Sequence, residues 1–184
     1  MKRIETKLIG VAILETPIHR DTRGAFWETF RADSIANVGL DVCFIQDAMS
    51  LSRKNTLRGL HFQAPPKQGK LVGLAAGTIY DVVVDIRQRS PTFGCWIGTA
   101  LTEGDGRLIW IPPGFAHGFV ALSDNTIVTY KLTNFGQDHE QVVRWDDPDL
   151  AIAWPVENPI VSERDAAAPL LRDAPVLPYY EPSS

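Results

Sequence analysis

The residues best suited to chemistry lie in one seven-residue stretch, Leu57–Gln63 (LRGLHFQ). It places a cation, Arg58, three residues before a titratable imidazole, His61, in an otherwise apolar run. Side chains alternate between the two faces of a strand, so we expect His61 on one face with Gly59, and Arg58 on the other with Leu60. The glycine would let a ligand or another backbone come close. The alternative is an ordinary half-buried strand with one satisfied histidine and one solvated arginine.

Turn signals divide the surrounding chain into short strands. Strands are predicted at 4–16, 25–30, 42–52 and 57–63, around a turn at 76–77 within 69–87, at 95–102, around the PPG turn of 107–124, and at 126–134. One short helix is predicted over 32–39 and a proline-forced loop over 64–67. Beyond residue 146 the composition changes, and residues 162–174 (SERDAAAPLLRDA) predict a second helical segment.

This pattern predicts the fold class. Roughly ten short strands at such spacing are typical of a sandwich or barrel. We therefore predict an all-β protein, a cupin-like double-sheet jelly roll with short peripheral helices towards the C-terminus. Residues 1–184 are expected to form a single domain, with a core over about 4–171 and a tail over 172–184.

Alternation is clearest in DVVVDIR (81–87), where Asp81, Val83 and Asp85 share one face of the predicted strand. The apolar Val82 and Val84 share the opposite face with Ile86. An acidic side chain on the inward face would be costly unless it is paired. The sequence does not say which face points inward.

A second histidine, His117, ends the segment PPGFAH, which resembles the second cupin motif. The first cupin motif requires His-x-His followed by Glu, and LHFQAPPKQ contains His61 alone. Two lone histidines are an incomplete set for a divalent metal, which commonly takes three or four protein ligands. We therefore predict that no metal is bound.

Composition excludes several other classes of protein. The chain has 184 residues and a formal net charge of −4, which argues against nonspecific binding to nucleic acid. Cys43 and Cys95 are too few for a disulfide framework and lack metal-ligand spacing. Charged Glu5 and Lys7 interrupt the N-terminal apolar run, so no signal peptide is expected. No apolar run reaches the roughly 18 residues of a membrane span, and we expect a cytoplasmic protein with no membrane partner.

Several motifs occur together in one order. They are DTRGAFWETF, LRGLHFQ, QGKLV, DVVVDIR, SPTFGCW, WIPPGFAHGF, TYKLTNF, and AIAWP followed by SERD. This ordered set, from about residue 4 to residue 171, closely resembles the dTDP-4-keto-6-deoxyglucose (dTDP-4-dehydrorhamnose) 3,5-epimerase family of deoxysugar biosynthesis. The resemblance implies a cupin-like, metal-free and cofactor-independent isomerase that acts on a dTDP-sugar. It also implies a homodimer in which N-terminal strands are exchanged.

The chemistry of such a reaction follows from its substrate. A 4-keto sugar has acidified protons on C3 and C5, because loss of either gives an enolate on the C4 oxygen. Epimerisation needs a base on one face, an acid on the other, and a cation or donor at that oxygen. The resemblance implies that His61 is the base and Asp165 its partner. It further implies that Lys70 stabilises the enolate and Tyr130 returns the proton.

The resemblance also implies the binding residues. Arg23 and Arg58 match positions that hold the diphosphate, a task suited to guanidinium groups. The other matched positions contact nucleotide or sugar, or line the pocket: Glu28, Gln46, Asp81 and His117. The chain departs from the usual family pattern at Ala48, Met49, Gly73 and Phe135. Ala48 stands where the family often has an asparagine, and Phe135 replaces a tyrosine at a position matched to substrate binding. Loss of the amide and the hydroxyl is expected to make the enzyme more selective between C3 and C5.

These departures leave other activities open. The chain is expected to invert C3, C5 or both. A single-site epimerase or a ketoisomerase acting on a related nucleotide sugar would retain the same scaffold. A noncatalytic cupin that binds a sugar nucleotide is the alternative from another class, although a binder needs no opposed acid and base.

Overall fold

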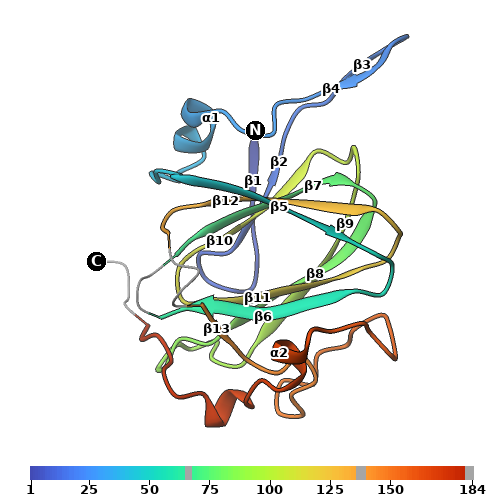
Figure 1. Ribbon diagram of the computed structural model, residues 1–184. Coiled ribbons are helices and arrows are strands. Elements are labelled where there is room, and N and C mark those ends of the chain that lie inside the picture. Colours follow the sequence, from blue (N-terminus) through green and yellow to red (C-terminus); the bar gives the residue numbers. More distant parts are fainter. Residues whose placement is uncertain (65–67, 136–139, 181–184) are drawn as a thin grey trace.

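The computed structural model describes residues 1–64, 68–135 and 140–180. Two antiparallel sheets are stacked in layers, as Figure 1 shows. The first contains, in spatial order, β1 (Lys2–Glu5), β2 (Ala12–Glu15), β10 (Arg107–Ile111), β7 (Lys70–Ala76), β12 (Thr126–Leu132) and β5 (Gln46–Ser52). The second contains β13 (Glu140–Val142), β6 (Leu57–Gln63), β11 (Phe115–Ala121), β8 (Thr78–Asp85) and β9 (Trp96–Thr102). The predicted double-sheet jelly roll is confirmed.

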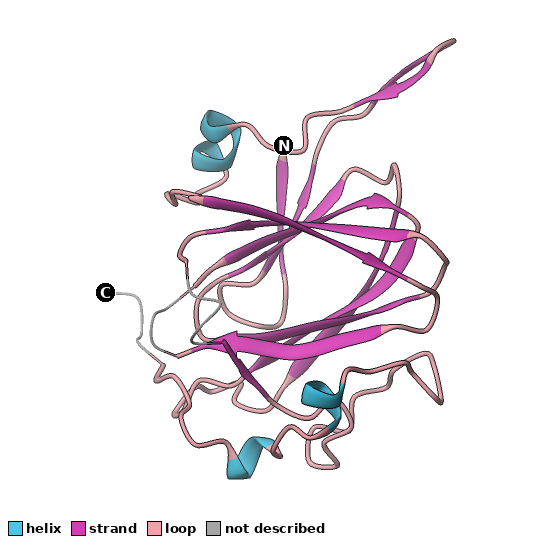
Figure 2. Ribbon diagram, viewed as in Figure 1, coloured by secondary structure: helices cyan, strands magenta, loops and turns pink. Residues whose placement is uncertain are grey.

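The remaining elements lie outside the two layers. A small hairpin of β3 (His19–Asp21) and β4 (Gly24–Phe26) projects from the body of the molecule (Figure 1). Helix α1 (Ala32–Asn37) packs near the six-stranded sheet, whereas α2 (Glu163–Ala166) and the 3-10 turn η2 (Leu171–Asp173) lie below the five-stranded sheet (Figure 2). No helix in the described part of the chain is long and apolar enough to cross a membrane.

The main hydrophobic core fills the space between the sheets. Val83 and Phe119 of the five-stranded sheet meet Val72, Ile109 and Val128 of the six-stranded sheet there. A second cluster lies on the outer face of the five-stranded sheet, under the C-terminal segments, and contains Leu60, Phe62, Val82, Val84, Ile86, Leu150 and Leu171. The alternation predicted in β8 is therefore present, because Val83 faces the interior while Val82 and Val84 face outward.

Several predicted elements have different bounds. The strand predicted over 4–16 is two strands, β1 and β2, because the Thr6 hydroxyl donates to the carbonyl groups of Leu8 and Val11 in an intervening turn. The strands predicted over 25–30 and 42–52 shorten to β4 and β5. The predicted loop over 64–67 lies outside the described residues apart from Ala64.

The helical predictions had mixed outcomes. The short helix over 32–39 is confirmed as α1, and it stops before Gly39, whose φ is +80°. The helical segment predicted over 162–174 is reduced to one turn of α2 and the separate turn η2. Pro169 accounts for the interruption, because proline lacks an N–H group and clashes with the preceding turn of a helix.

Candidate active site

An irregularity in β6 brings Arg58 and His61 to the same side of the sheet. His61 lies opposite His117 on β11, and Arg58 lies opposite Phe119, so three steps along β6 match two along β11. A bulge of this kind changes the direction of a side chain. Both residues consequently line one cavity, and the expectation that alternation would separate them was wrong.

Gly59 makes this irregularity sterically acceptable. Its φ is +130°, and a Cβ atom at this position would lie 2.5 Å from the Cα atom of Gly118 on β11. Only a residue without a side chain fits such a contact. The close approach expected at Gly59 is thus made by another backbone.

The imidazole of His61 is held by a carboxylate from α2. Its Nε2 atom lies 2.8 Å from Oδ1 of Asp165, and the backbone N–H of Gly59 donates to Oδ2 of the same carboxylate. Asp165 sits in the first turn of α2, where the backbone N–H of Asp165 donates to the Ser162 hydroxyl. Burial acts to raise the pKa of Asp165, but the hydrogen bonds from His61, Gly59 and Ser162 outweigh it and lower that pKa. The aspartate therefore stays ionised and fixes the orientation of the ring.

Lys70 on β7 carries a buried ammonium group into the same cavity. Its Nζ atom donates to the backbone carbonyl of His61 at 3.4 Å. Burial lowers the pKa of Lys70, against the attraction of Glu140 and Asp81, which acts to raise it. A desolvated cation of this kind interacts strongly with any negative charge that develops beside it.

Tyr130 on β12 faces the cavity from the sheet opposite to His61. Its hydroxyl lies 3.2 Å from the Ser50 hydroxyl. Burial raises the pKa of Tyr130 to about 12. The phenol is therefore protonated near neutral pH and is able to donate its proton.

The cavity has a volume of about 330 Å³ and lies between the two sheets. Among the residues predicted to bind or react, it brings together Gln46, Arg58, His61, Lys70, His117 and Tyr130. Asp81 is buried directly behind it and lies 2.7 Å from His117. A larger cavity of about 510 Å³ on the outer face of the six-stranded sheet contains neither His61 nor Lys70, so we assign the chemistry to the smaller one.

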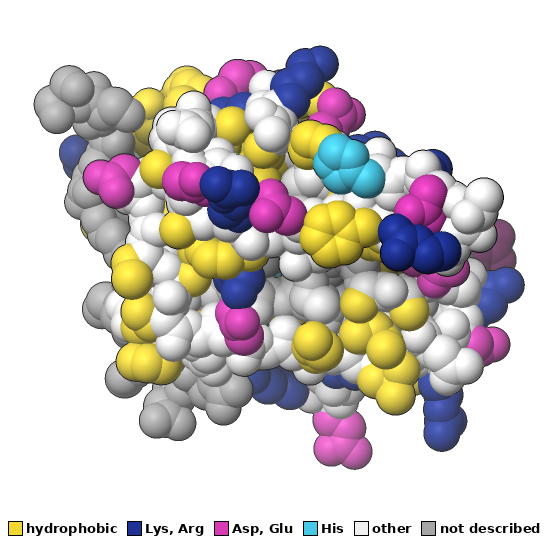
Figure 3. Space-filling view, turned by 90° about the horizontal axis from the view of Figure 1, so that it is seen from above, with side chains coloured by type: hydrophobic (Ala, Val, Ile, Leu, Met, Phe, Trp, Pro, Cys, Tyr) yellow, Lys and Arg dark blue, Asp and Glu magenta, His cyan; other side chains and the backbone are white. Residues whose placement is uncertain are grey.

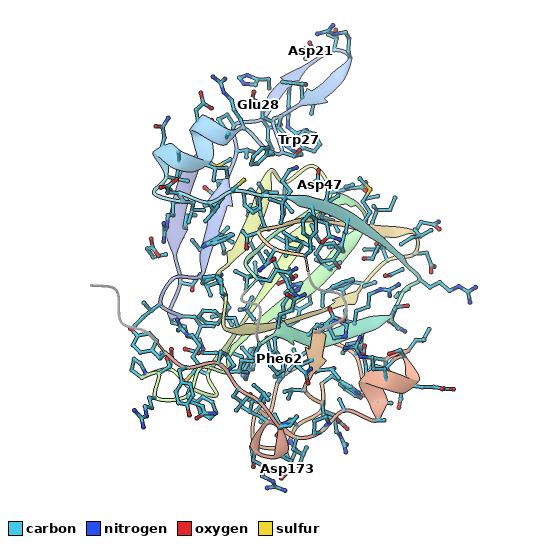
Figure 4. The ribbon with its side chains drawn as sticks, turned by 60° about the vertical axis from the view of Figure 1, so that its left-hand side comes forward. Asp21, Trp27, Glu28, Asp47, Phe62 and Asp173 are labelled. Atoms are coloured by element: carbon cyan, nitrogen blue, oxygen red, sulfur yellow. The ribbon has the colours of Figure 1, made fainter. Side chains whose placement is uncertain are left out.

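Three predicted residues are not at this cavity. Arg23 is at the tip of the projecting hairpin, where it pairs with Asp21, and Glu28 follows the hairpin (Figure 4). Both positions are remote from the cavity because the hairpin leads the chain away from the sheets. Phe135 is 62% exposed and is also not among the lining residues.

The sequence interpretation missed several lining residues: Ser50, Gln63, Gln68, Phe119, Leu132 and Glu140. Ser50 follows Gln46 and Ala48 at a spacing of two, so alternation along the predicted strand would have placed it on the same face. Glu140 lies on β13, a strand of three residues that is too short for a periodic signal. Its carboxylate Oε1 is 3.8 Å from Nδ1 of His61.

The described residues contain no group of three or more histidine, cysteine, aspartate or glutamate side chains arranged to hold a metal ion. Titratable side chains from both sheets line the cavity: the imidazole of His61 lies on one sheet, and the ammonium of Lys70 and the phenol of Tyr130 lie on the other. Groups of these kinds can transfer protons.

Comparison with known proteins gives a consistent result. Residues 5–173 match the family model described as dTDP-4-dehydrorhamnose 3,5-epimerase. A relative with that name from Methanothermobacter thermautotrophicus is 46% identical over 177 residues, which are 94% of this chain and 96% of the relative. The relative of the same name from Salmonella typhimurium is 46% identical over 175 residues, covering 93% and 96% respectively.

Solved structures agree with these relatives. A dTDP-6-deoxy-D-glucose-3,5-epimerase from Legionella pneumophila, in complex with dTDP-4-keto-L-rhamnose, superposes with a TM-score of 0.93 and 44% identity, covering 98% of this chain and 99% of that one. A 3'-monoepimerase from Streptomyces bikiniensis, in complex with dTDP-quinovose, gives a TM-score of 0.89 and 34% identity, with 95% and 92% covered.

Proposed function

Because the chain belongs to the dTDP-4-dehydrorhamnose 3,5-epimerase family, we propose that it inverts C3 and C5 of a dTDP-4-keto-6-deoxyhexose without a cofactor, in deoxysugar biosynthesis of the rhamnose type. It is an epimerase, and hence an isomerase. One observation carries the proposed chemistry: His61 and Tyr130 come from different sheets and line a single cavity that also contains Lys70. A base and an acid on opposite sides are what inversion at carbon requires.

The proposed reaction begins when the imidazole of His61 removes a proton from the carbon next to the C4 carbonyl. Asp165 stabilises the imidazolium that forms, because its carboxylate lies 2.8 Å from Nε2. The electrons pass to the C4 oxygen, where the ammonium of Lys70 stabilises the enolate. Tyr130 then gives its proton to the carbon from the opposite face, which inverts the centre.

The remaining cavity residues are proposed to bind the substrate. Arg58 lines the cavity, and its guanidinium is held in place because its Nε atom donates to the Ser52 hydroxyl and its Nη2 atom to the Leu51 carbonyl. A guanidinium held in this way suits a diphosphate. Gln46 lies in the same lining, and the buried pair of His117 and Asp81 is proposed to orient Lys70 or the sugar.

We also propose that the active protein is a homodimer joined through its N-terminal segments. An isolated two-stranded hairpin is marginally stable, yet every residue of β3 and β4 is exposed in the single chain. Phe26 of this hairpin is a large hydrophobic residue and is 68% exposed, and Met49 on β5 is 75% exposed. Figure 3 shows hydrophobic groups among charged ones on this side of the molecule. Exchange of the hairpins would carry Arg23 and Glu28 towards the partner's cavity. A cytoplasmic location stays a prediction.

A second candidate function is inversion of one carbon. It is favoured by Ala48, which lines the cavity at a position where the family often has an asparagine. Inverting two carbons requires the half-reacted sugar to settle in a second pose, and a lost amide cannot hold that pose by a hydrogen bond. Such a loss costs about 0.5–1.5 kcal/mol. Phe135 was expected to contribute in the same way, but its exposed position gives that half of the argument no support.

The test is incubation with dTDP-4-keto-6-deoxyglucose in deuterated water, followed by NMR of the label at C3 and C5. Label and inversion at both carbons are the expected result. Label confined to one carbon, and extended to the second by Ala48→Asn, would favour the single-site epimerase. Binding of the substrate without label at either carbon would leave the noncatalytic binder as the better assignment.

A further inference from the structure

We propose that Glu140 is the proton outlet of His61: it removes the proton that His61 has taken from the sugar, so that the base is free for the next inversion. Arg164 is proposed as the positioning residue that holds Glu140 in place. The inference rests on the proposed epimerase function and concerns a step that follows each inversion.

The need for this step follows from proton balance. In one inversion the C–H bond breaks and an N–H bond forms on His61, while the O–H bond of Tyr130 breaks and a new C–H bond forms. The sugar has then lost one proton and gained one. The enzyme, however, is left with a protonated His61 and a deprotonated Tyr130. Neither residue can act again until one proton leaves His61 and another reaches Tyr130.

Two carboxylates lie beside the imidazole, and they differ in their access to water. Asp165 binds Nε2 at 2.8 Å, but its side chain is only 5% exposed. Glu140 has its Oε1 atom 3.8 Å from Nδ1, and its side chain is 28% exposed. That separation is closed by a small rotation of the side chain or by one bridging water molecule. Glu140 is consequently the carboxylate that can both reach His61 and pass a proton to solvent.

Arg164 fixes which oxygen of Glu140 faces His61. Its Nη1 atom donates to Oε2 of Glu140 at 2.9 Å, and its Nη2 atom donates to the backbone carbonyl of Glu140 at 2.6 Å. Oε1 is thereby left on the side of the imidazole. Arg164 precedes Asp165 on the single turn of α2, so this turn positions both carboxylates around one ring.

The complete reset conserves protons. The Nδ1–H bond of the imidazolium breaks, an O–H bond forms on Glu140, and Glu140 then releases the proton to water. On the other side, the phenolate of Tyr130 takes a proton from the Ser50 hydroxyl, 3.2 Å away, which takes one from water in turn. One proton leaves and one enters, and no oxidant or reductant is involved.

A time course separates this role from a role in the chemical step. The enzyme is mixed in deuterated water with a fivefold excess of dTDP-4-keto-6-deoxyglucose, and deuterium in the sugar is counted by mass spectrometry after rapid quenching. For Glu140→Gln we expect a fast first incorporation of one deuterium per site, at close to the parent rate. Later incorporation should be slowed by about 10²-fold, the scale of a lost acid–base group. Added formate, which replaces the missing carboxylate, should speed the slow phase.

Two further variants complete the test. Glu163→Gln on the exposed side of α2 is the matched control and should behave as the parent. Arg164→Gln should show the same two phases, with a smaller reduction in the rate of later incorporation. Arg164→Lys should bring this later rate back close to that of the parent. A merely structural role of Arg164 would instead reduce both phases together.

Other outcomes of the same time course would overturn the proposal. If Glu140→Gln slows the first incorporation as much as the later ones, Glu140 acts on the sugar or through Lys70 and is not the outlet. If it slows neither phase, or if formate has no effect, the proton leaves by another route. If the parent enzyme incorporates no deuterium at either carbon, the proposed epimerase function itself has failed.

Discussion

The Nε2 atom of His117 lies 2.7 Å from Oδ2 of Asp81, so the site contains a second histidine–carboxylate pair beside that of His61 and Asp165. The two pairs differ in exposure. The His117 side chain is 4% exposed, while that of His61 is 24% exposed. The rings of His117 and Tyr130 also pack in a T-shaped arrangement, with the ring centroids 6.4 Å apart. The more accessible pair is the one suited to exchange protons with a sugar.

This difference predicts unequal effects of the same substitution at the two histidines. His61→Asn should reduce the rate of deuterium exchange at the acidified carbons by about 10²–10⁴-fold, because the base is lost. His117→Asn should raise the KM but retain exchange within about tenfold, because its role is to orient other groups. Label exchange in deuterated water measures both. A His61→Asn protein that exchanges at the parent rate would refute the assignment of the base.

Replacing the acid should uncouple exchange from inversion. In Tyr130→Phe the enolate still forms, but no proton is delivered from the far face. We therefore expect deuterium to enter the substrate with its original configuration, while inversion falls by about 10²-fold or more. NMR of recovered sugar distinguishes exchange from inversion. Inversion at an unchanged rate would show that another group is the acid.

Tyr130→Phe should also change how the stability of the fold depends on pH above pH 10. Burial raises the pKa of Tyr130 from 10.0 to about 12, so between these values the unfolded chain loses a proton that the folded chain keeps. The contribution of Tyr130 is complete below pH 10 and is lost as pH rises to about 12. At about 1.4 kcal/mol per pKa unit, this amounts to about 2–3 kcal/mol. Urea unfolding at both pH values should show a shallower decline for Tyr130→Phe.

Lys70 is expected to increase the activity of the enzyme and to lower the stability of the fold. Burial lowers its pKa in the folded state, so the unfolded chain binds the proton more readily below the ordinary lysine pKa. Parent stability should therefore increase as pH rises from the lowered pKa towards the ordinary one. Lys70→Met should stabilise the fold near neutral pH, by at most about 1–4 kcal/mol, and should reduce epimerisation by about 10²-fold or more.

Thermal unfolding at neutral pH measures this stabilisation, with Lys54→Met as the exposed control. A Lys70→Met protein that is less stable than the parent at neutral pH would mean that the ammonium is a net structural contact in the fold.

Arg58 should affect binding more than chemistry. The Arg58→Ala protein would lose the charge-assisted hydrogen bonds proposed with the diphosphate, each worth about 1.5–3 kcal/mol. We expect kcat/KM to fall by about 10- to 100-fold while kcat at saturation stays near the parent value. Steady-state kinetics give both constants. An equal fall in kcat and kcat/KM would assign Arg58 a role in the transition state instead.

The molar mass in solution tests the proposed dimer. Light scattering at micromolar concentration should give twice the chain mass of 20.4 kDa. Met49→Asp, which places a charge on the exposed face of β5, should shift the protein towards the monomer, because an unpaired charge is costly in an interface. Ile160→Asp serves as the control, since Ile160 is also exposed but lies in the C-terminal region. A parent protein that stays monomeric would contradict the dimer.

The fold could be predicted because the turn signals and the alternation of side chains mark most of the strands. In β8, Val83 faces the core between the sheets, whereas Val82 and Val84 face the second hydrophobic cluster. The order of the motifs indicated the family. Local patterns failed where tertiary contacts decide. The alternation of side chains does not hold between Arg58 and His61, because β6 is irregular where it pairs with β11 and Gly59 lies directly against Gly118. No local pattern could relate His61 to Asp165, since 104 residues separate them.

The placement of His61 and Tyr130 on different sheets has a consequence for how substitutions can change the enzyme. The opening that a sugar must fit is the separation of two packed sheets, about 10 Å in such folds. Side chains such as Val83 and Val128, which lie in the core between the sheets and do not line the cavity, act as spacers that set this separation. A substitution that adds or removes a methylene in one of these core side chains would shift His61 relative to Tyr130. It would thereby change which carbon of the sugar lies between the two residues. Selectivity between C3 and C5 could thus be changed by substitutions in the hydrophobic interior, without substitution of either His61 or Tyr130.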